Sequence, residues 1–220
     1  MSPMKSVLVT GGTKRIGKVI AETLRARGWN VLVASRTPGE GVLGADLAEP
    51  LGPARLYAQA LAAAPDLCAI VNNAAVFSTA AELPSEEEAR MRAVNVVAPQ
   101  KLTMLLSGRE GMKCAVVNVL DCRVLSPAAP DETPYAKTKR ELLEYTRKSA
   151  GLFAESMRVN AVAPGPVLAP EGCHEKAGEL LLDRRPTPAD VAAAVAYLLE
   201  AEATTGAVIP VDAGQHLLYV

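Results

Sequence analysis

Tyr135 and Lys139 form the pair of side chains in this sequence that most directly indicates chemistry. Their spacing in a segment of helical period places them one turn apart on the same helix face. A free phenol is a poor proton donor or base at neutral pH, but a nearby ammonium favours the phenolate and lowers the phenol pKa. The pair can then deliver a proton to a carbonyl group that is receiving hydride.

A glycine-rich turn, TGGTKRIG, follows the first apolar run of the chain. A strand that ends in such a turn and opens a helix directs several backbone N–H groups and the positive end of the helix dipole at one spot, which binds phosphate. An arginine replaces the middle glycine of a dinucleotide-binding fingerprint and adds a fixed charge. We expect phosphate contacts along the turn, although a plain strand-to-helix turn is the alternative; the residues concerned are Gly11, Thr13, Lys14, Arg15, Ile16 and Gly17.

Ser35, Arg36 and Thr37 follow the second apolar run. A carboxylate at this place would bind the ribose 2′-hydroxyl of NAD, whereas an arginine accommodates a 2′-phosphate. With Arg15 close by in such a fold, two cations would surround that phosphate, which favours NADP; solvated surface arginines are the alternative. The dipeptide Asp46-Leu47 comes after a possible third strand, where it could contact the adenine or simply form a turn.

Small and amide residues follow the next apolar run, at Asn73, Ala74 and Ala75. They suit the close approach of a cofactor's ribose and nicotinamide, and they also suit a turn. Phe77 lies just beyond and could stack on a planar substrate or be a core aromatic. Asn95 is a poor helix former inside a helical segment, where it could hold a water that links Lys139 to solvent or lie on the helix surface.

The elements that position these residues alternate between strands and helices. Apolar runs occur at Ser6 to Thr10, Val31 to Ala34, Ala69 to Asn72, Ala115 to Leu120, Arg158 to Val162 and Ala207 to Val211, with a possible further one at Val42 to Ala45. Helical periods separate them at Ile16 to Arg27, Leu51 to Ala63, Glu86 to Ser107, Pro134 to Ala150 and Pro188 to Ala201. This order predicts one α/β domain over residues 1–220, a doubly wound parallel sheet of about seven strands with ligands at the carboxyl ends of the strands.

Composition restricts the partners. The net charge of −1 and the lack of a Lys/Arg block argue against nucleic acid and anionic membranes, so we expect a small-molecule substrate. No apolar stretch reaches the roughly 18 residues of a membrane span, and we expect a cytoplasmic protein. The scattered cysteines and two histidines indicate neither disulfide nor metal. The segment from Pro164 to Thr187 has no clear period, as is typical of a lid or binding loop.

Several segments together resemble the short-chain dehydrogenase/reductase family: TGGTKRIG, NNAA, Asn95, YAKTK, the APGP turn at Ala163 to Pro166 and TGAVIPVDAG at Thr205 to Gly214. The resemblance runs along the whole chain in order. Within the family, the sequence is most similar to pteridine reductases and the related dihydromonapterin and dihydrofolate reductases. This likeness is carried by the KRIG form of the turn, by Arg36, by Phe77 and by Asp121, which stands where most members have a catalytic serine.

The resemblance implies a Rossmann fold that binds NADPH, with Pro164 and Gly165 beside the cofactor, and a homotetramer in which the Glu86 to Ser107 and Pro134 to Ala150 helices pack against their symmetry mates. It also implies that Tyr135, Lys139 and Asn95 take part in catalysis, and that Tyr135 and Lys139 contact the cofactor as well, with the Lys139 ammonium reaching the nicotinamide ribose. Asp121 would supply a proton to a ring nitrogen, and Phe77 would stack on a pterin.

Alternatives to Asp121 and to the function stay open at this stage. Thirteen residues separate Asp121 from Tyr135, one more than expected, so Cys122 is the rival for the serine position, and Asp121 could simply cap a turn. A carbonyl reductase, such as one for 3-oxoacyl thioesters, would use Tyr135 alone. A non-catalytic NADP-sensing protein is the alternative of another class, although it would not need the Tyr135 and Lys139 pair.

Overall fold

The computed structural model describes residues 5–126, 133–168 and 179–218. Its centre is a parallel sheet in which all strand pairs run in the same direction, in the order β3-β2-β1-β4-β5-β6-β7. The predicted seven-stranded, doubly wound sheet is therefore confirmed. The strands are β1 (Ser6–Thr10), β2 (Asn30–Ser35), β3 (Val42–Gly44), β4 (Leu67–Asn72), β5 (Cys114–Val119), β6 (Met157–Pro164) and β7 (Val208–Val211).

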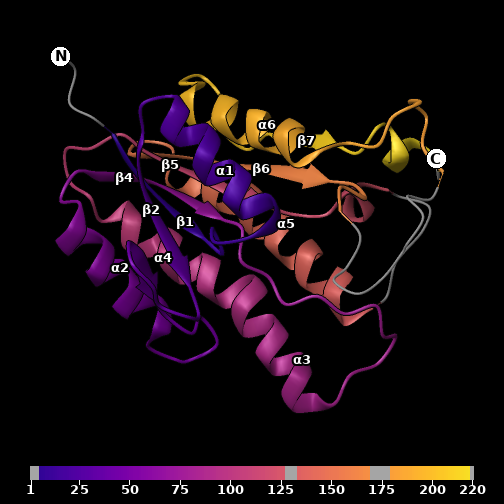
Figure 1. Cartoon of the computed structure of the whole chain (residues 1–220), viewed down its shortest axis with the longest axis horizontal. Coiled ribbons are helices and arrows are strands. Elements are labelled where there is room, and N and C mark those ends of the chain that lie inside the picture. Colours follow the sequence, from indigo (N-terminus) through magenta and orange to yellow (C-terminus); the bar gives the residue numbers. More distant parts are fainter. Residues whose placement is uncertain (1–4, 127–132, 169–178, 219–220) are drawn as a thin grey trace.

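Helices cover both faces of the sheet (Figure 1). One face packs against α2, α4 and part of α5, and the other packs against α1 and α6. The strands are buried on both sides, which explains why they read as continuous apolar runs rather than alternating ones. The helices are α1 (Arg15–Ala26), α2 (Gly52–Ala63), α3 (Ser85–Arg92), α4 (Ala98–Ser107), α5 (Pro134–Leu152) and α6 (Pro188–Glu200).

The long helical segment expected from Glu86 to Ser107 is interrupted. It consists of α3, a π-helical turn at Ala93–Val97 and α4. A π turn widens the helix locally and occurs frequently at functional sites. Here it contains Asn95, which is 1% exposed. The alternative that Asn95 is a surface residue is therefore wrong.

The segment between β6 and α6 is described only at its two ends, since residues 169–178, with Cys173 and His174, lie outside the described residues. At its far end, Thr187 accepts a hydrogen bond from the Asp190 N–H, and the Asp190 carboxylate accepts one from the Thr187 N–H. This capping box starts α6. Among the helices that the structure describes, none is long and apolar enough to cross a membrane.

Candidate active site

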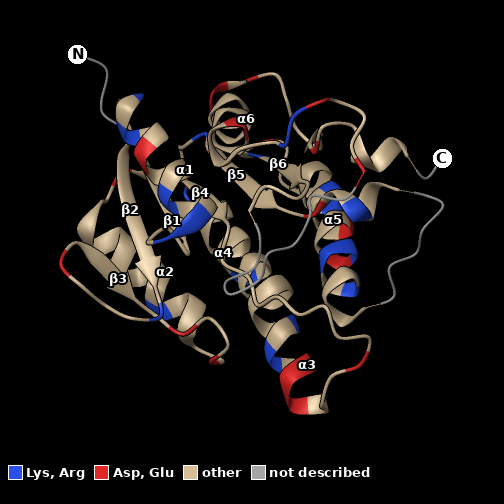
Figure 2. Cartoon of the chain, turned by 45° about the vertical axis from the view of Figure 1, so that its right-hand side comes forward, with Lys and Arg blue, Asp and Glu red and all other residues tan. Residues whose placement is uncertain are grey.

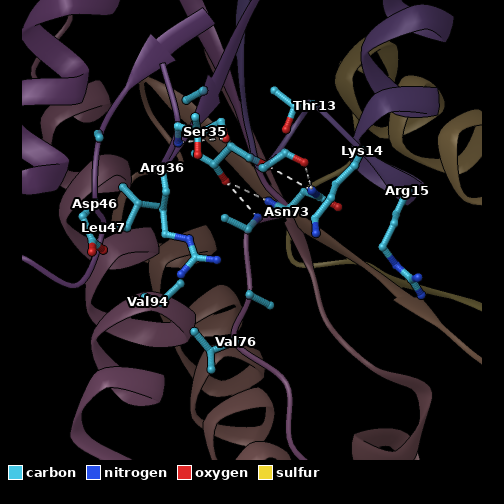
Figure 3. Close-up of a pocket in the computed structure, with 18 of the residues that line it drawn as sticks. Thr13, Lys14, Arg15, Ser35, Arg36, Asp46, Leu47, Asn73, Val76 and Val94 are labelled. Atoms are coloured by element: carbon cyan, nitrogen blue, oxygen red, sulfur yellow. Dashed lines mark hydrogen bonds between the residues drawn. The ribbon is translucent and has the colours of Figure 1, made fainter. Parts of the chain in front are cut away.

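A cleft of about 970 Å³ opens at the carboxyl ends of β1, β2 and β4 (Figure 3). This is the edge of the sheet where the sequence places its polar strand-end residues. The cleft brings together the glycine turn, the segment after β2, Asp46-Leu47 and the segment after β4. Its lining includes Gly11, Thr13, Lys14, Arg15, Ile16, Gly17, Ser35, Arg36, Thr37, Asp46, Leu47, Asn73, Ala74, Ala75 and Phe77, all of which the sequence singled out.

The glycine turn leaves no room for side chains at its two framing positions. Gly11 has a φ of +65°, a left-handed conformation that favours glycine. A Cβ on Gly17 would stand 2.2 Å from the Gly11 carbonyl oxygen and 2.4 Å from Asn73 Nδ2. Arg15 adopts a φ of 53°, so an arginine holds the left-handed position that a glycine takes without strain.

The Asn73 amide holds this turn in place. Its Nδ2 donates to the carbonyl oxygens of Thr10, at 3.0 Å, and Gly11, at 3.1 Å. The Thr10 hydroxyl in turn accepts from the N–H groups of Asn73 and Ala74, both at 3.1 Å. The Asn73 amide thus fixes the glycine turn (Figure 3), and its contact with a cofactor stays a prediction.

The two arginines expected around a 2′-phosphate point in different directions. Arg36 and Lys14 extend into the cleft, whereas Arg15 turns away from them (Figure 3). Arg15 Nη2 donates to the Leu168 carbonyl oxygen at 3.4 Å, beside the segment that follows β6. Both arginines line the cleft, and the expectation that they surround one 2′-phosphate stays a prediction.

Local hydrogen bonds shape the part of the cleft formed by the segments after β2 and β3. The Thr37 N–H donates to Ser35 Oγ at 3.3 Å, which turns the chain after β2. Asp46 Oδ1 accepts from the Ala48 N–H at 2.9 Å. This hydrogen bond, together with the nearby Arg90 and Arg36 guanidinium groups, lowers the pKa of the Asp46 carboxyl below its ordinary value.

Tyr135 and Lys139 lie on the same face of α5, as predicted. Pro134 occupies the first turn, and Thr133 caps the helix by accepting from the Ala136 N–H. Tyr135 is 7% exposed and Lys139 is 3% exposed. Lys139 Nζ lies 5.6 Å from the centroid of the Tyr135 ring and donates to the Val119 carbonyl oxygen at 2.8 Å.

The expected lowering of the phenol pKa is not found. Burial, with the neighbouring Asp121 carboxylate, raises the pKa of Tyr135 well above its ordinary value. Burial also lowers the pKa of Lys139 to about 8. The physical reason is that desolvation acts on both groups, while the ammonium is engaged with a backbone carbonyl rather than with the phenol. Tyr135 therefore keeps its proton at neutral pH.

Asn95 connects the segment after β4 to α5. Its Oδ1 accepts from the Val76 N–H at 2.8 Å, and its Nδ2 donates to the Val76 carbonyl oxygen at 2.9 Å and to Thr138 Oγ1 at 3.0 Å. The side chain thus positions the wall of the cleft relative to the helix of Tyr135. The water link to Lys139 stays a prediction.

Asp121 stands between Tyr135 and an arginine that sequence reasoning missed. Arg123 Nε donates to Asp121 Oδ1 at 3.0 Å, and its Nη2 donates to Oδ2 at 3.1 Å. The Arg123 guanidinium carbon also lies 5.5 Å from the centroid of the Tyr135 ring. Asp121 additionally caps the short helix that follows by accepting from the Arg123 N–H. Asp121 therefore caps a turn and also neighbours Tyr135, and its part in catalysis stays a prediction.

Cys122 does not compete with Asp121 for this place. The Cys122 side chain is 2% exposed, and its Sγ donates to Gln215 Oε1 at 3.3 Å. Burial raises the pKa of its thiol to about 12. It is therefore a protonated, buried residue behind the site.

Phe77 presents its ring to the cleft. The side chain is 46% exposed and meets the Tyr135 ring edge-on, with the centroids 4.8 Å apart. The alternative that Phe77 is a core aromatic is wrong. Phe77 is the residue that joins the cleft to Tyr135, since Tyr135, Lys139 and Asp121 are not part of the cleft lining.

Pro164 ends β6, and Gly165 follows it. The Gly165 N–H donates to the Val211 carbonyl oxygen at 3.0 Å, and a Cβ here would stand 2.7 Å from Asp212 Cβ. Close packing against the segment after β7 thus explains the glycine. Neither residue lines the cleft, so their contact with a cofactor stays a prediction.

Known proteins resemble this chain over nearly its whole length. A family model described as Enoyl-(Acyl carrier protein) reductase matches residues 11–216. The granaticin polyketide synthase putative ketoacyl reductase 2 of Streptomyces violaceoruber is 31% identical over 96% of each chain. A dihydromonapterin reductase from Klebsiella pneumoniae is 28% identical over 97% of each chain. The structure of FolM alternative dihydrofolate reductase 1 from Brucella canis, complexed with NADP, has a TM-score of 0.86 at 32% identity, covering 97% of this chain and 94% of that chain.

Proposed function

The chain belongs to the short-chain dehydrogenase/reductase family, and we propose that it is an NADPH-dependent reductase of a flat, polar heterocycle, a dihydropterin or a dihydrofolate. The observation that carries the choice of substrate is the exposed Phe77 ring set edge-on against Tyr135. The cofactor is supported by the cleft, and by similar proteins whose structures contain NADP or NADPH.

The residues of the cleft fit a dinucleotide phosphate. The turn between Gly11 and Gly17 excludes side chains from the place where a pyrophosphate approaches backbone N–H groups. Arg36 and Lys14 extend into the same space, and no carboxylate directly follows β2. Arg36 would therefore hold the 2′-phosphate, and Asp46 would face the adenine. When bound, NADPH supplies the hydride for the reduction.

Tyr135 supplies the proton that accompanies reduction. Because burial raises its pKa, the phenol holds its proton at neutral pH, and it donates that proton as hydride transfer makes the receiving atom more basic. Lys139 lies on the same helix face and anchors the end of β5 through the Val119 carbonyl. Asn95 fixes the opposite wall of the site through Val76. These residues bring the proton donor and the cleft into one rigid arrangement.

Asp121 and Arg123 favour a heterocycle over a simple ketone. A carboxylate and a guanidinium side by side offer acceptors and donors in one plane. The amino, ring N–H and carbonyl groups of a pterin present the complementary donors and acceptors along one edge. Phe77 offers a flat apolar surface for the ring itself. We propose that Asp121 binds the substrate edge and relays a proton to a ring nitrogen.

A carbonyl reductase of 3-oxoacyl thioesters is the second candidate. It is favoured by the similarity to a polyketide ketoacyl reductase, and Tyr135 alone would serve it. An NADP sensor is the candidate from another class. The pairing of a buried Tyr135 with a buried Lys139 argues against it, because cofactor binding without turnover needs neither group.

The deciding experiment measures NADPH oxidation with dihydrobiopterin, dihydrofolate and an acetoacetyl thioester, for the wild type and for Asp121→Asn and Asp121→Ser. We expect the wild type to prefer a pterin or folate. Asp121→Asn should lose that activity while NADPH affinity survives, and Asp121→Ser should not restore it. A folded Asp121→Asn variant with full pterin activity would contradict the proposal, and a wild type active only on the thioester would favour the second candidate.

We further propose a cytoplasmic homotetramer. Exposed apolar side chains lie on the helices that would form its interfaces, with Met104 at 62% on α4 and Leu152 at 76% on α5. Since α5 also contains Tyr135, assembly would fix the catalytic helix. Light scattering at micromolar concentration measures the assembly, and an active monomer would contradict it.

A further inference from the structure

An ion pair closes the adenine end of the cleft. Arg90 Nη2, from α3, donates to Asp46 Oδ2, from the segment after β3, at 2.9 Å. Both residues line the cleft, and both are partly exposed, at 42% for the Arg90 side chain and 29% for Asp46. The contact joins segments that are far apart in the chain, and no motif in the sequence connects them.

Two sets of contacts hold the Arg90 and Asp46 pair in place. The last turn of α3 is basic and its first turn acidic, an order that complements the helix dipole (Figure 2). Arg92, on the same turn as Arg90, pairs with Glu141 of α5, with Nε 3.0 Å from Oε2. On the other side, Asp46 Oδ1 accepts from the Ala48 N–H. The carboxylate therefore has one partner on each oxygen.

The distribution of charged side chains in the cleft indicates what the ion pair of Arg90 and Asp46 could do. The charged side chains of the lining are Lys14, Arg15, Arg36 and Arg90 against the single carboxylate of Asp46. The phosphate-binding end is already provided with cations, so Arg90 is not needed there. Arg90 instead pairs with Asp46, the carboxylate that the proposed function places at the adenine. The 6-amino group of adenine donates hydrogen bonds, and a carboxylate can accept one.

We propose that Arg90 is a positioning residue for adenine recognition, one that holds the Asp46 carboxylate in the orientation that accepts a hydrogen bond from the 6-amino group of the cofactor. The proposal rests on the NADPH-binding function proposed above. An aspartate with one oxygen fixed by a backbone N–H and the other by a guanidinium loses little further side-chain freedom on binding. A carboxylate oxygen can accept more than one hydrogen bond, so Arg90 leaves a lone pair of Asp46 available.

The test compares NADPH with its analogue in which hypoxanthine replaces adenine, so that a carbonyl replaces the 6-amino group. The dissociation constants are measured by fluorescence titration for the wild type, Arg90→Met, Arg90→Lys and Asp46→Leu. We expect the wild type to prefer the adenine form by roughly tenfold, the factor for one hydrogen bond to a charged group. Arg90→Met should reduce this preference about threefold or more, Arg90→Lys should largely keep it, and Asp46→Leu should abolish it.

Arg27→Met is the matched control. Arg27 pairs with Glu200 at 2.8 Å and is 45% exposed, but it lies outside the cleft lining. Its loss should leave the base preference unchanged. An unchanged preference in Arg90→Met, with or without a lower melting temperature, would overturn the positioning role, as would a stronger preference, which would mean that Arg90 competes with the adenine. A wild type that binds neither dinucleotide would overturn the proposed function as well.

Discussion

The Phe77 ring meets the Tyr135 ring at an interplanar angle of 81°, with the centroids 4.8 Å apart. This contact joins the segment after β4 to the first turn of α5. One ring is half exposed and the other is buried, so the pair presents an apolar surface directly beside a protected phenol. A planar substrate on Phe77 would have its reducible bond next to the proton donor.

Replacing Phe77 by leucine keeps an apolar side chain and removes the ring. We expect the KM for a dihydropterin to rise roughly three- to tenfold, because an aromatic pair contributes about 0.5–1.5 kcal/mol beyond the area that it buries. Turnover of an acetoacetyl thioester should change far less. Tyr197→Leu is the control, since Tyr197 is an exposed aromatic on α6 outside the cleft. Equal effects of Phe77→Leu on both substrates would argue against stacking.

Tyr135→Phe removes the proton donor and leaves the ring in contact with Phe77. We expect kcat to fall about 100- to 10,000-fold, the usual contribution of a general acid, while the Kd for NADPH changes little. Steady-state rates and cofactor titration on the same preparation measure both quantities. Wild-type rates in this variant would exclude the phenol as the acid and turn attention to Asp121.

The strands and the positions of the strand-end residues could be predicted because buried parallel strands leave a direct pattern in the sequence. The glycine turn and the pair of Tyr135 and Lys139 could also be predicted, since local spacing determines both. The π turn at Ala93–Val97 could not be predicted, because a π turn between two helices hardly changes the period of the apolar residues. Only the buried partners of Asn95 distinguish it.

The pairings between charged side chains of the site could not be predicted from the sequence. Arg123 forms two hydrogen bonds with the Asp121 carboxylate, and Arg90 reaches Asp46 from a separate helix; no motif in the sequence marks either arginine. The sequence likewise did not indicate the contact of Arg15 with the Leu168 carbonyl oxygen. Such contacts depend on where tertiary packing places each backbone segment. The aspartate two residues before Arg123 was the one local signal that could have suggested its partner.

Arg36→Ala tests the preference for the phosphorylated cofactor. The loss of one charge-assisted contact costs about 1.5–3 kcal/mol, so the Kd for NADPH should rise roughly ten- to a hundredfold. The Kd for NADH should stay almost unchanged, because NADH has no 2′-phosphate. Fluorescence titration of both dinucleotides measures this. Equal affinities for NADPH and NADH in the wild type would contradict the assignment of Arg36.

Lys139 makes stability depend on pH. Its pKa is about 8 in the folded protein, against an ordinary value of 10.5, so between these values the unfolded chain binds more protons than the native one. The contribution of Lys139 to the free energy of unfolding should therefore rise with pH across this window, by about 3 kcal/mol. The buried Cys114 and Cys122 thiols, whose pKa values burial raises, contribute in the opposite direction. Below the pKa of Lys139 in the folded protein, both the folded and the unfolded chain hold the proton. The folded protein then bears the full free-energy cost of burying the Lys139 ammonium.

Lys139→Met should remove this rise. Denaturant titrations of both proteins from about pH 7.5 to about pH 9.5 measure it as the difference between their pH profiles, because the buried Cys114 and Cys122 thiols act in the opposite direction equally in both. Parallel pH profiles for the wild type and Lys139→Met would show that Lys139 is not desolvated as the structure describes.

Gly17→Ala tests the glycine turn with the smallest possible side chain. The added Cβ would stand 2.2 Å from the Gly11 carbonyl oxygen, so the turn or the first residues of α1 must move. Overpacking of this kind costs about 1–3 kcal/mol, and the Kd for NADPH should rise at least about tenfold. Gly151→Ala is the matched control, since Gly151 also lies in a helix and its Cβ would meet nothing within 4 Å. That change should raise the free energy of unfolding by about 0.5–1 kcal/mol and leave NADPH binding intact. A Gly17→Ala protein with wild-type NADPH affinity would mean that the turn does not approach the pyrophosphate, and the cleft would need another ligand.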